Sequence, residues 1–251
     1  MFVDTHAHIY SEFYDDIDEI IRRSKNQGIM PIINNGCDNK SNKEVVNNLN
    51  DFIFGALGIH PESVDNYIDE DILFIEKNLN NPKIVAIGEI GLDYHYTKEN
   101  KKKQIELFER QLKLAEQYNM PVIIHSRDAT EDTINTLKKY KLKGVIHSFS
   151  GSLETAKLYL KMGFKLGING VITFKNARIK EVYEKLSLDD FVIETDSPYL
   201  TPEPYRGYQN EPQYAYYTAQ FVAKLFNISL EQLAEVTNRN ARSIFDKLLI
   251  P

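Results

Sequence analysis

Short apolar runs alternate along most of the chain with longer segments whose apolar residues recur every three or four positions. The apolar runs predict eight strands, at residues 2–5, 29–33, 52–58, 84–90, 120–124, 144–147, 164–168 and 191–195. The amphipathic segments between them predict helices at 14–26, 40–50, 69–79, 98–119, 128–140, 152–162 and 176–186. Strands that alternate with helices indicate a parallel sheet, because each helix carries the chain back to the start of the next strand.

Eight strand–helix units predict an α/β protein of the (β/α)8 class, a TIM barrel. The 251 residues fit one such domain over 1–251, and no linker or repeat indicates a second. An open doubly wound sheet is the alternative, but no Gly-x-Gly-x-x-Gly follows a strand, which favours the barrel. A polar loop at 197–212 then leads to helices expected at 212–226, 229–236 and 239–248.

Composition and charge bear on the compartment and on the partners. The sequence has no apolar run of about 18 residues and no signal-peptide pattern, so we expect a cytoplasmic protein with no membrane contact. Cys37 is the only cysteine, which excludes a disulfide within the chain. The net charge of −6 argues against a broad electrostatic grip on duplex nucleic acid. It leaves open a local site that binds one phosphate through metal ions.

Residue types that bind metals gather where the predicted strands end. Side chains alternate along a strand, so Asp4, His6 and His8 share one face. In a (β/α)8 barrel the carboxyl ends of the strands form the active site. The metal-ligand types at these ends are His6, His8, His60, Glu89, His125, His147 and Asp196. Singly, each has a structural alternative, such as a core histidine or a turn former, but together they predict a metal site.

Four of these five histidines, together with the two carboxylates, already exceed what one four-coordinate ion needs, and Glu89 has two oxygens with which to bridge two ions. The mixed nitrogen and oxygen ligands suit two divalent ions of zinc, manganese, cobalt or nickel, and more weakly magnesium. Two such ions would activate a water and neutralise charge on a phosphate. Arg127 is a candidate phosphate partner, with a structural role as the alternative. Asp4 and Glu194 lie inward and would at most support the ligands.

The sequence resembles the TatD family of metal-dependent deoxyribonucleases, within the amidohydrolase-like barrel group. Six motifs in the family's order carry the resemblance, and they span almost the whole chain. They are Asp4-Thr5-His6-Ala7-His8, Gly58-Ile59-His60-Pro61, Gly88-Glu89-Ile90-Gly91-Leu92-Asp93-Tyr94, Ile124-His125-Ser126-Arg127, His147-Ser148-Phe149-Ser150-Gly151 and Thr195-Asp196-Ser197-Pro198-Tyr199-Leu200.

The resemblance implies a two-metal centre and assigns its ligands. One ion would be held by His6, His8, Glu89 and Asp196, and the other by Glu89, His125 and His147, with Glu89 as the bridge. It also implies that His60 lies near the scissile phosphate and that Asp196 takes a proton from the attacking water. The activity implied is that of a metal-dependent phosphodiesterase, a 3′–5′ exonuclease on single-stranded DNA or on nucleic-acid ends.

The sequence departs from the family in the segment 204–212, where members often carry a basic stretch. Arg206 is kept, but Tyr208 and Gln209 stand where lysine and arginine are usual. Arg206 and Tyr205 are therefore candidate substrate contacts, together with Tyr199 and Tyr208, because tyrosine rings stack on unpaired bases. The alternative is that these tyrosines pack the loop onto the barrel.

Two other functions compete with the phosphodiesterase. One is an amidohydrolase or lactonase that acts on a small molecule or on a D-aminoacyl-tRNA ester, since fold and His-x-His pair suit it equally. Many such enzymes bridge their metals with a carbamylated lysine near the end of the fourth strand, whereas this chain has Glu89 there, which favours the phosphodiesterase. The other is a non-catalytic module that keeps metals for stability, which the full ligand set argues against.

Overall fold

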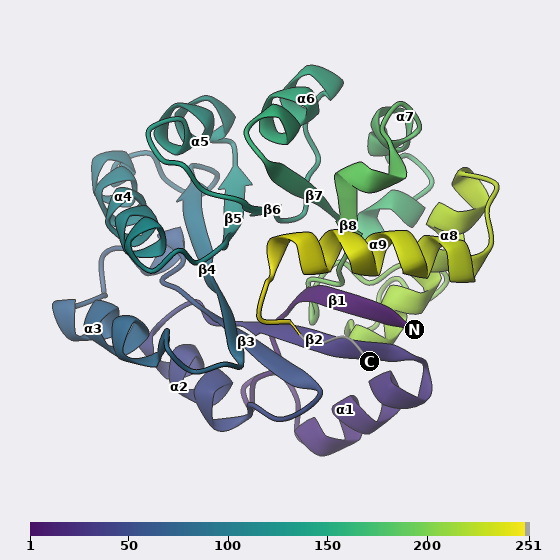
Figure 1. Cartoon of the computed structure of the whole chain (residues 1–251), viewed down its shortest axis with the longest axis horizontal. Helices are drawn as coiled ribbons and strands as arrows, with labels where there is room; N and C mark the ends of the chain where they lie inside the picture. Colours follow the sequence, from purple (N-terminus) through teal and green to yellow (C-terminus); the bar gives the residue numbers. More distant parts are fainter. Residues whose placement is uncertain (249–251) are drawn as a thin grey trace.

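A computed structural model describes residues 1–248 and confirms the (β/α)8 barrel (Figure 1). In this part of the chain one sheet contains eight parallel strands, whose order in space follows their order in the sequence. That order belongs to a barrel and excludes the doubly wound alternative. The strands are β1 (Phe2–Ala7), β2 (Ile29–Asn35), β3 (Ile53–Leu57), β4 (Ile84–Asp93), β5 (Val122–Arg127), β6 (Gly144–Ile146), β7 (Phe164–Ile168) and β8 (Phe191–Ile193).

Seven helices connect successive strands and form an outer ring, and two more follow the last strand (Figure 1). The helices of the described residues are α1 (Ile17–Asn26), α2 (Asn39–Asn47), α3 (Asp69–Asn78), α4 (Lys101–Gln117), α5 (Thr130–Leu137), α6 (Leu153–Lys161), α7 (Ile179–Tyr183), α8 (Ala215–Leu225) and α9 (Leu230–Ile244). Short 3-10 turns lie at η1 (Pro61–Ser63), η2 (Gly170–Thr173), η3 (Leu188–Asp190) and η4 (Pro212–Tyr214). None of these helices is both long enough and apolar enough to span a membrane.

The seam between β1 and the chain that follows β8 closes the barrel. The backbone N–H of Asp196 donates to the carbonyl of His6 at 2.9 Å. The buried carboxylate of Asp4 accepts hydrogen bonds from the backbone N–H and the hydroxyl of Thr195, at 3.0 and 2.6 Å. Burial raises the pKa of Asp4 to about 8, although these hydrogen bonds oppose the shift. The seam therefore places His6 beside Asp196, although 190 residues separate them in the sequence.

The C-terminal segment differs from its prediction. Two helices were expected at 229–236 and 239–248, but the structure has the single helix α9 and no helix beyond Ile244 within the described residues. Asn238 lies between the two predicted helices and has a weak helix propensity. Its side chain accepts from the N–H of Val3 at 3.1 Å and donates to the carbonyl of Met1 at 2.9 Å. These contacts with the first strand stabilise the helix across that position.

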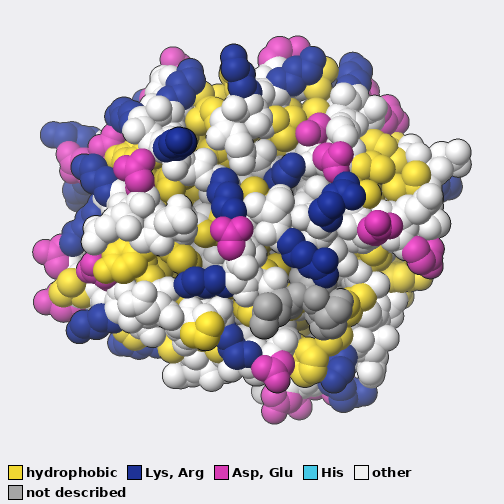
Figure 2. All heavy atoms as spheres, viewed as in Figure 1, with side chains coloured by type: hydrophobic (Ala, Val, Ile, Leu, Met, Phe, Trp, Pro, Cys, Tyr) yellow, Lys and Arg dark blue, Asp and Glu magenta, His cyan; other side chains and the backbone are white. Residues whose placement is uncertain are grey.

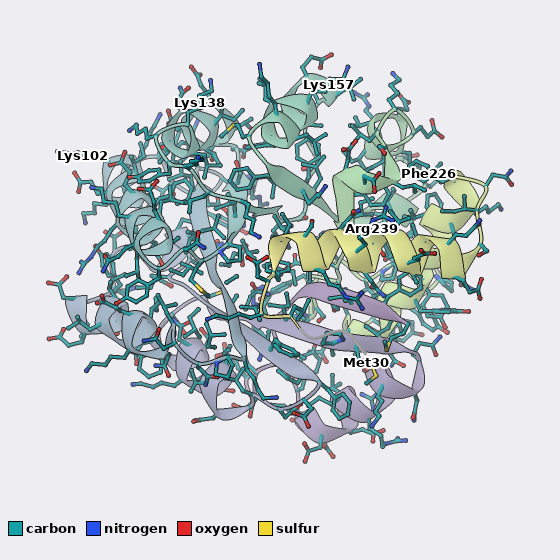
Figure 3. All side chains as sticks on the ribbon, viewed as in Figure 1. Met30, Lys102, Lys138, Lys157, Phe226 and Arg239 are labelled. Carbon is teal, nitrogen blue, oxygen red and sulfur yellow. The ribbon has the colours of Figure 1, made fainter. Side chains whose placement is uncertain are left out.

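Helix α9 covers the amino ends of the strands on the face seen in Figure 1. Beneath it, Phe245 is fully buried in an apolar cluster with side chains from most of the strands. The strand residues of this cluster are Val3, Ile33, Phe54, Ala56, Val85, Ala86, Ile123, Val145 and Val192. On the outside of α9, Arg239 pairs with Asp189 at 2.6 Å (Figure 3). Charges of both signs are mixed over this face, and none of the described histidines is visible on it (Figure 2).

Candidate metal centre

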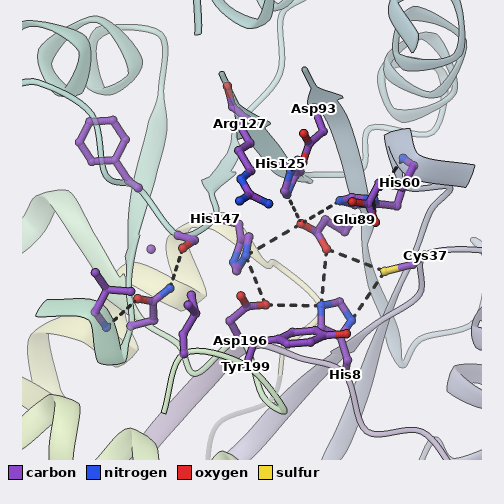
Figure 4. A pocket seen from close by; sticks show the side chains of 18 of the residues that line it. His8, Cys37, His60, Glu89, Asp93, His125, Arg127, His147, Asp196 and Tyr199 are labelled. Carbon is purple, nitrogen blue, oxygen red and sulfur yellow. Dashed lines mark hydrogen bonds and ion pairs between the residues drawn. The ribbon is translucent and has the colours of Figure 1, made fainter. Parts of the chain in front are cut away.

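The carboxyl ends of the strands open into a cavity of about 720 Å³. Most of the side chains expected to bind metals line this cavity, and Figure 4 shows them pointing toward one another. They are His8, His60, Glu89, His125, His147 and Asp196. His6 lies beside His8 and is fully buried. Strand β4 runs three residues further than predicted, so that Glu89 and Asp93 both belong to it.

Four donor atoms converge between β1, β4 and the end of β8. The Nε2 atoms of His6 and His8 are 3.1 Å apart. Glu89 Oε2 lies 3.4 Å from the first of these nitrogens and 3.5 Å from the second. Asp196 Oδ1 lies 3.7 and 3.5 Å from the same two atoms. Tetrahedral ligands about 2.1 Å from a metal would be about 3.4 Å apart, so this spacing fits a divalent cation.

The other oxygen of Glu89 faces a second group of imidazoles. Glu89 Oε1 lies 2.9 Å from His125 Nδ1, 3.8 Å from His60 Nε2 and 3.9 Å from His147 Nε2. His147 Nε2 is closer to Asp196 Oδ1, at 3.4 Å. His147 therefore lies between the two groups, and its assignment to the second ion stays a prediction. Glu89 has the position of a bridge, with one oxygen toward each group.

The charges at this centre are unusual for a protein interior. Burial alone would raise the pKa of Glu89, but His6, His60 and His125 hold that pKa well below its ordinary value. Among the described residues, the ion-pair partners of Glu89 are histidines rather than Arg127. The buried Nδ1 of His6 has no hydrogen-bond partner. Buried carboxylates among imidazoles with unmet hydrogen-bonding capacity fit a site built for cations.

The outward-facing nitrogens of two ligands are held by residues that the sequence analysis did not assign. His8 Nδ1 lies 3.0 Å from the carbonyl oxygen of Asn35, and His125 Nε2 lies 2.9 Å from Asp93 Oδ2. Such contacts fix the ring so that the other nitrogen faces the ion. Asp93 could have been found, because it lies four residues after Glu89 on the same strand and so on the same face.

Cys37 was also not assigned to the site. Its sulfur lies 3.7 Å from His8 Nδ1 and 3.8 Å from Glu89 Oε2. The thiol is partly buried, and desolvation raises its pKa, although His8 opposes the shift. Cys37 follows the end of β2 by two residues, so the strand-end argument that selected the histidines applies to it as well.

The expected substrate contacts fall into two groups. Arg127 lines the cavity, and its guanidinium lies 5.2 Å from the ring centre of the exposed Tyr96. Tyr199 also lines the cavity and is 52% exposed, which leaves its ring accessible to a ligand (Figure 4). His95, which follows β4, is half exposed and pairs with Asp128 at 2.9 Å.

Tyr205 and Arg206 lie elsewhere. The ring of Tyr205 stacks on Tyr214, with centroids 4.8 Å apart, and its hydroxyl lies 3.1 Å from that of Tyr217. The guanidinium of Arg206 lies 4.2 Å above the ring of Phe174. In the described structure neither residue lines the cavity. The structure therefore favours the alternative for Tyr205, that of a tyrosine that packs the loop, and a substrate contact by either residue stays a prediction.

Comparisons with known proteins agree with the fold and with a metal-dependent hydrolase. The family model described as TatD related DNase matches residues 3–246. Bacillus subtilis YabD, named an uncharacterized metal-dependent hydrolase, is 42% identical over 252 residues, which cover 98% of this chain and 99% of that protein. Escherichia coli K12 YcfH, described in the same words, is 32% identical over 255 residues, which cover 97% of this chain and 95% of that protein.

Solved structures of TatD homologues also superpose on this chain over almost its whole length. The crystal structure of Escherichia coli YjjV, a TatD homolog, superposes with a TM-score of 0.90 at 29% identity and covers 100% of this chain and 98% of that one. A TatD family hydrolase from Entamoeba histolytica superposes with a TM-score of 0.86 at 25% identity, with 98% of each chain covered. An engineered lactonase matches at a TM-score of 0.68 and 14% identity, with 97% of this chain and 95% of that one covered. That last likeness shows the fold alone.

Proposed function

The chain belongs to the TatD-related DNase family of metal-dependent hydrolases, and on this premise we propose that it removes nucleotides from the 3′ end of single-stranded DNA. One observation carries the proposal of a two-metal phosphodiesterase. The two oxygens of Glu89 face different ligands, with Oε2 3.4 Å from His6 and Oε1 2.9 Å from His125. A carboxylate shared in this way suits two neighbouring ions, the arrangement that clamps a phosphate during in-line displacement.

The residues would divide between two divalent ions. His6, His8, Glu89 and Asp196 would hold the first, and Glu89 with His125 the second, with His147 between them. Ions bound there would supply a water of lowered pKa and would neutralise the charge that develops on the phosphate. Magnesium, manganese and zinc are the candidates that suit this mixture of imidazole and carboxylate ligands.

His60 has the position and the protonation state of a hydrogen-bond donor to the substrate. Its Nδ1 accepts a hydrogen bond from the N–H of Glu62 at 3.3 Å, so the proton of the neutral ring is on Nε2. Burial and the nearby His125 lower the pKa of His60 to about 3, so the ring is neutral at pH 7. Nε2 faces the centre, 3.8 Å from Glu89 Oε1, from where it can donate to a phosphate oxygen.

Asp196 is the proposed acceptor of the proton from the attacking water. Burial opposes its ionisation, but His147 and His8 hold the pKa of Asp196 well below its ordinary value, so the carboxylate is charged at pH 7. Its side chain is 14% exposed to the cavity, against 4% for that of Glu89. Asp196 is therefore the more accessible of the two carboxylates to a water that approaches a bound phosphate.

The charged side chains around the mouth of the cavity favour a nucleic acid that enters the cavity by one of its ends. Acidic side chains line the side of the cavity formed by the loops after β1 and β3 and by α2 with its N-cap, namely Glu12, Asp38, Glu44 and Glu62. The lysine on that side, Lys40, pairs with Glu12 at 2.8 Å. A nucleic acid lying across the whole mouth would be repelled there. Its backbone would instead leave along the side of Arg127, and Tyr199 offers a ring for a terminal base.

A small-molecule amidohydrolase or lactonase is the competing function. Enzymes of that kind that bridge their ions with a carbamylated lysine need a lysine at the centre. In the described lining of the cavity the lysine is Lys40, which lies at the rim in its pair with Glu12. Glu89 in the bridging position therefore supports the phosphodiesterase.

A substrate panel tests the proposal. The protein is stripped of metal, reloaded in turn with Mg²⁺, Mn²⁺ and Zn²⁺, and incubated with 5′-labelled single-stranded DNA, duplex DNA, RNA, a bis-aryl phosphate and an N-acyl amino acid. We expect single-stranded DNA to shorten one nucleotide at a time from its 3′ end. Cleavage of the N-acyl amino acid without cleavage of any of the four phosphodiesters would contradict the proposal.

A further inference from the structure

A carboxylate outside the cavity makes a close contact with the metal centre. Glu194 directly follows β8 and is fully buried. Among the described residues its ion-pair partner is His147, whose Nδ1 lies 3.0 Å from Glu194 Oε1. No lysine or arginine in the described part of the chain pairs with it. A buried carboxylate is costly without a cationic partner, which indicates a purpose other than stability.

The surrounding backbone holds this carboxylate in one place. Oε1 accepts a hydrogen bond from the N–H of Ser148 at 2.7 Å. On its other side the carboxylate lies against Gly167 in β7. A Cβ atom at position 167 would lie 2.2 Å from Glu194 Oε2 and 2.4 Å from its carboxyl carbon. Any larger residue there would displace the carboxylate, so the space for Glu194 depends on this glycine.

The contact determines which way the His147 ring faces. His147 Nδ1 lies 3.0 Å from Glu194 Oε1 in an ion pair whose geometry is not that of a hydrogen bond, and Nε2 faces the centre, 3.4 Å from Asp196 Oδ1. The ring is also stacked on that of His6, with centroids 3.6 Å apart and planes 19° apart. A carboxylate behind a ligand imidazole fixes its tautomer and makes its other nitrogen a stronger donor to a metal.

We propose that Glu194 is a positioning residue of the metal centre, which acts by holding His147 in the orientation and tautomer that bind an ion. Gly167 contributes to this arrangement, because it leaves room for the carboxylate of Glu194. The inference rests on the proposed metal centre but not on the identity of the substrate. It predicts that changes at two positions outside the cavity's ligand set alter the affinity for metal.

The test uses the full chain, stripped of metal and titrated with Co²⁺, with affinity measured by calorimetry and ligand field by visible absorption. Glu194→Gln keeps the size of the side chain and removes its charge. We expect one cobalt site to weaken by about 10–100-fold, with a changed visible spectrum. Asp71→Asn is the matched control, because Asp71 is also buried but accepts a hydrogen bond from the N–H of Ile68, away from the centre. It should leave both readouts unchanged.

Gly167→Ala provides a second variant that removes no charge. It should displace Glu194 and weaken the same cobalt site, and it carries the test if Glu194→Gln does not fold. Parental affinity and an unchanged spectrum in a folded variant would overturn the inference while leaving the proposed function intact. If the parent chain itself bound no Co²⁺, the proposed metal centre would fail instead. The titration contains no nucleic acid, so the result is independent of the nuclease assay.

Discussion

The two ends of the barrel are built from the same strands but from opposite kinds of side chain. At the amino ends, α9 and Phe245 close the barrel over an apolar cluster. At the carboxyl ends, the buried side chains are imidazoles and carboxylates that face one another at 2.9–3.9 Å. Apolar packing stabilises the fold, whereas buried charge opposes folding unless it is compensated.

Stability and chemistry therefore depend on separate parts of this molecule. Apolar burial at the amino ends contributes folding free energy that offsets the cost of burying charged groups at the other end. Changes at one end should therefore affect activity without a matching loss of stability, and changes at the other end should do the reverse.

The largest effect is expected at the proposed bridge. Glu89→Gln removes the charge shared by both groups of ligands, so we expect kcat to fall by about 10³-fold, or ~4 kcal/mol of transition-state stabilisation. Kinetics on labelled single-stranded DNA and a count of bound metal check this. Asp51→Asn, a change at an exposed residue that pairs with Lys83 outside the lining of the cavity, is the control and should keep full activity. Near-parental turnover of Glu89→Gln would remove Glu89 from the bridge.

The opposite end should show the reverse behaviour. Phe245→Ala empties a fully buried position under α9, and we expect the free energy of unfolding to drop by about 3–5 kcal/mol. Urea unfolding measures the loss, and kcat per folded molecule should be unchanged. Leu158→Ala, at a residue that is 44% exposed on α6, should cost less than about 0.5 kcal/mol. A fall in kcat of the folded Phe245 variant would show that the two ends are coupled.

A smaller effect on activity is expected at His60, which is proposed to donate to a phosphate oxygen. His60→Ala should lower kcat by about 10²-fold with the metal content unchanged. Elemental analysis beside the kinetics separates the two roles, because loss of metal would make His60 a ligand instead. His95→Ala changes a half-exposed histidine that pairs with Asp128, and it should have no effect on turnover.

The smallest effect is expected at the mouth. Arg127→Ala should raise KM for single-stranded DNA by about 5–10-fold with little change in kcat, because the guanidinium contacts the backbone outside the reacting phosphate. Arg206→Ala is the matched control, since Arg206 stacks on Phe174 and does not line the cavity in the described structure. Equal effects of the two substitutions would restore Arg206 as a substrate contact.

The sequence predicted the parts of the site that strand periodicity controls. His6, Glu89, His125 and the other ligands stand at strand ends, where the parallel order of the sheet brings side chains together. Loop residues were harder to place, because their direction depends on packing that no periodicity reveals. Tyr205 stacks on Tyr214 rather than facing the cavity for this reason.

Contacts between distant segments of the chain also could not be predicted from the hydrophobic periodicity. The prediction broke the last helix at Asn238, because local propensity does not include the hydrogen bonds from that residue to Met1 and Val3. Asp93 was present in a recognised motif, but its pairing with His125 depends on the register of β4 against β5. Sequence periodicity thus located the centre, and tertiary contacts determined how its ligands are held.

Anomalous diffraction from crystals of the chain grown with Mn²⁺ or Zn²⁺ would show whether two ions share Glu89. We expect two peaks at the carboxyl ends of the strands, one on either side of Glu89. The first should be bound by His6 and His8, and the second by His125. A single peak without contact to Glu89, or peaks away from these side chains, would contradict that expectation.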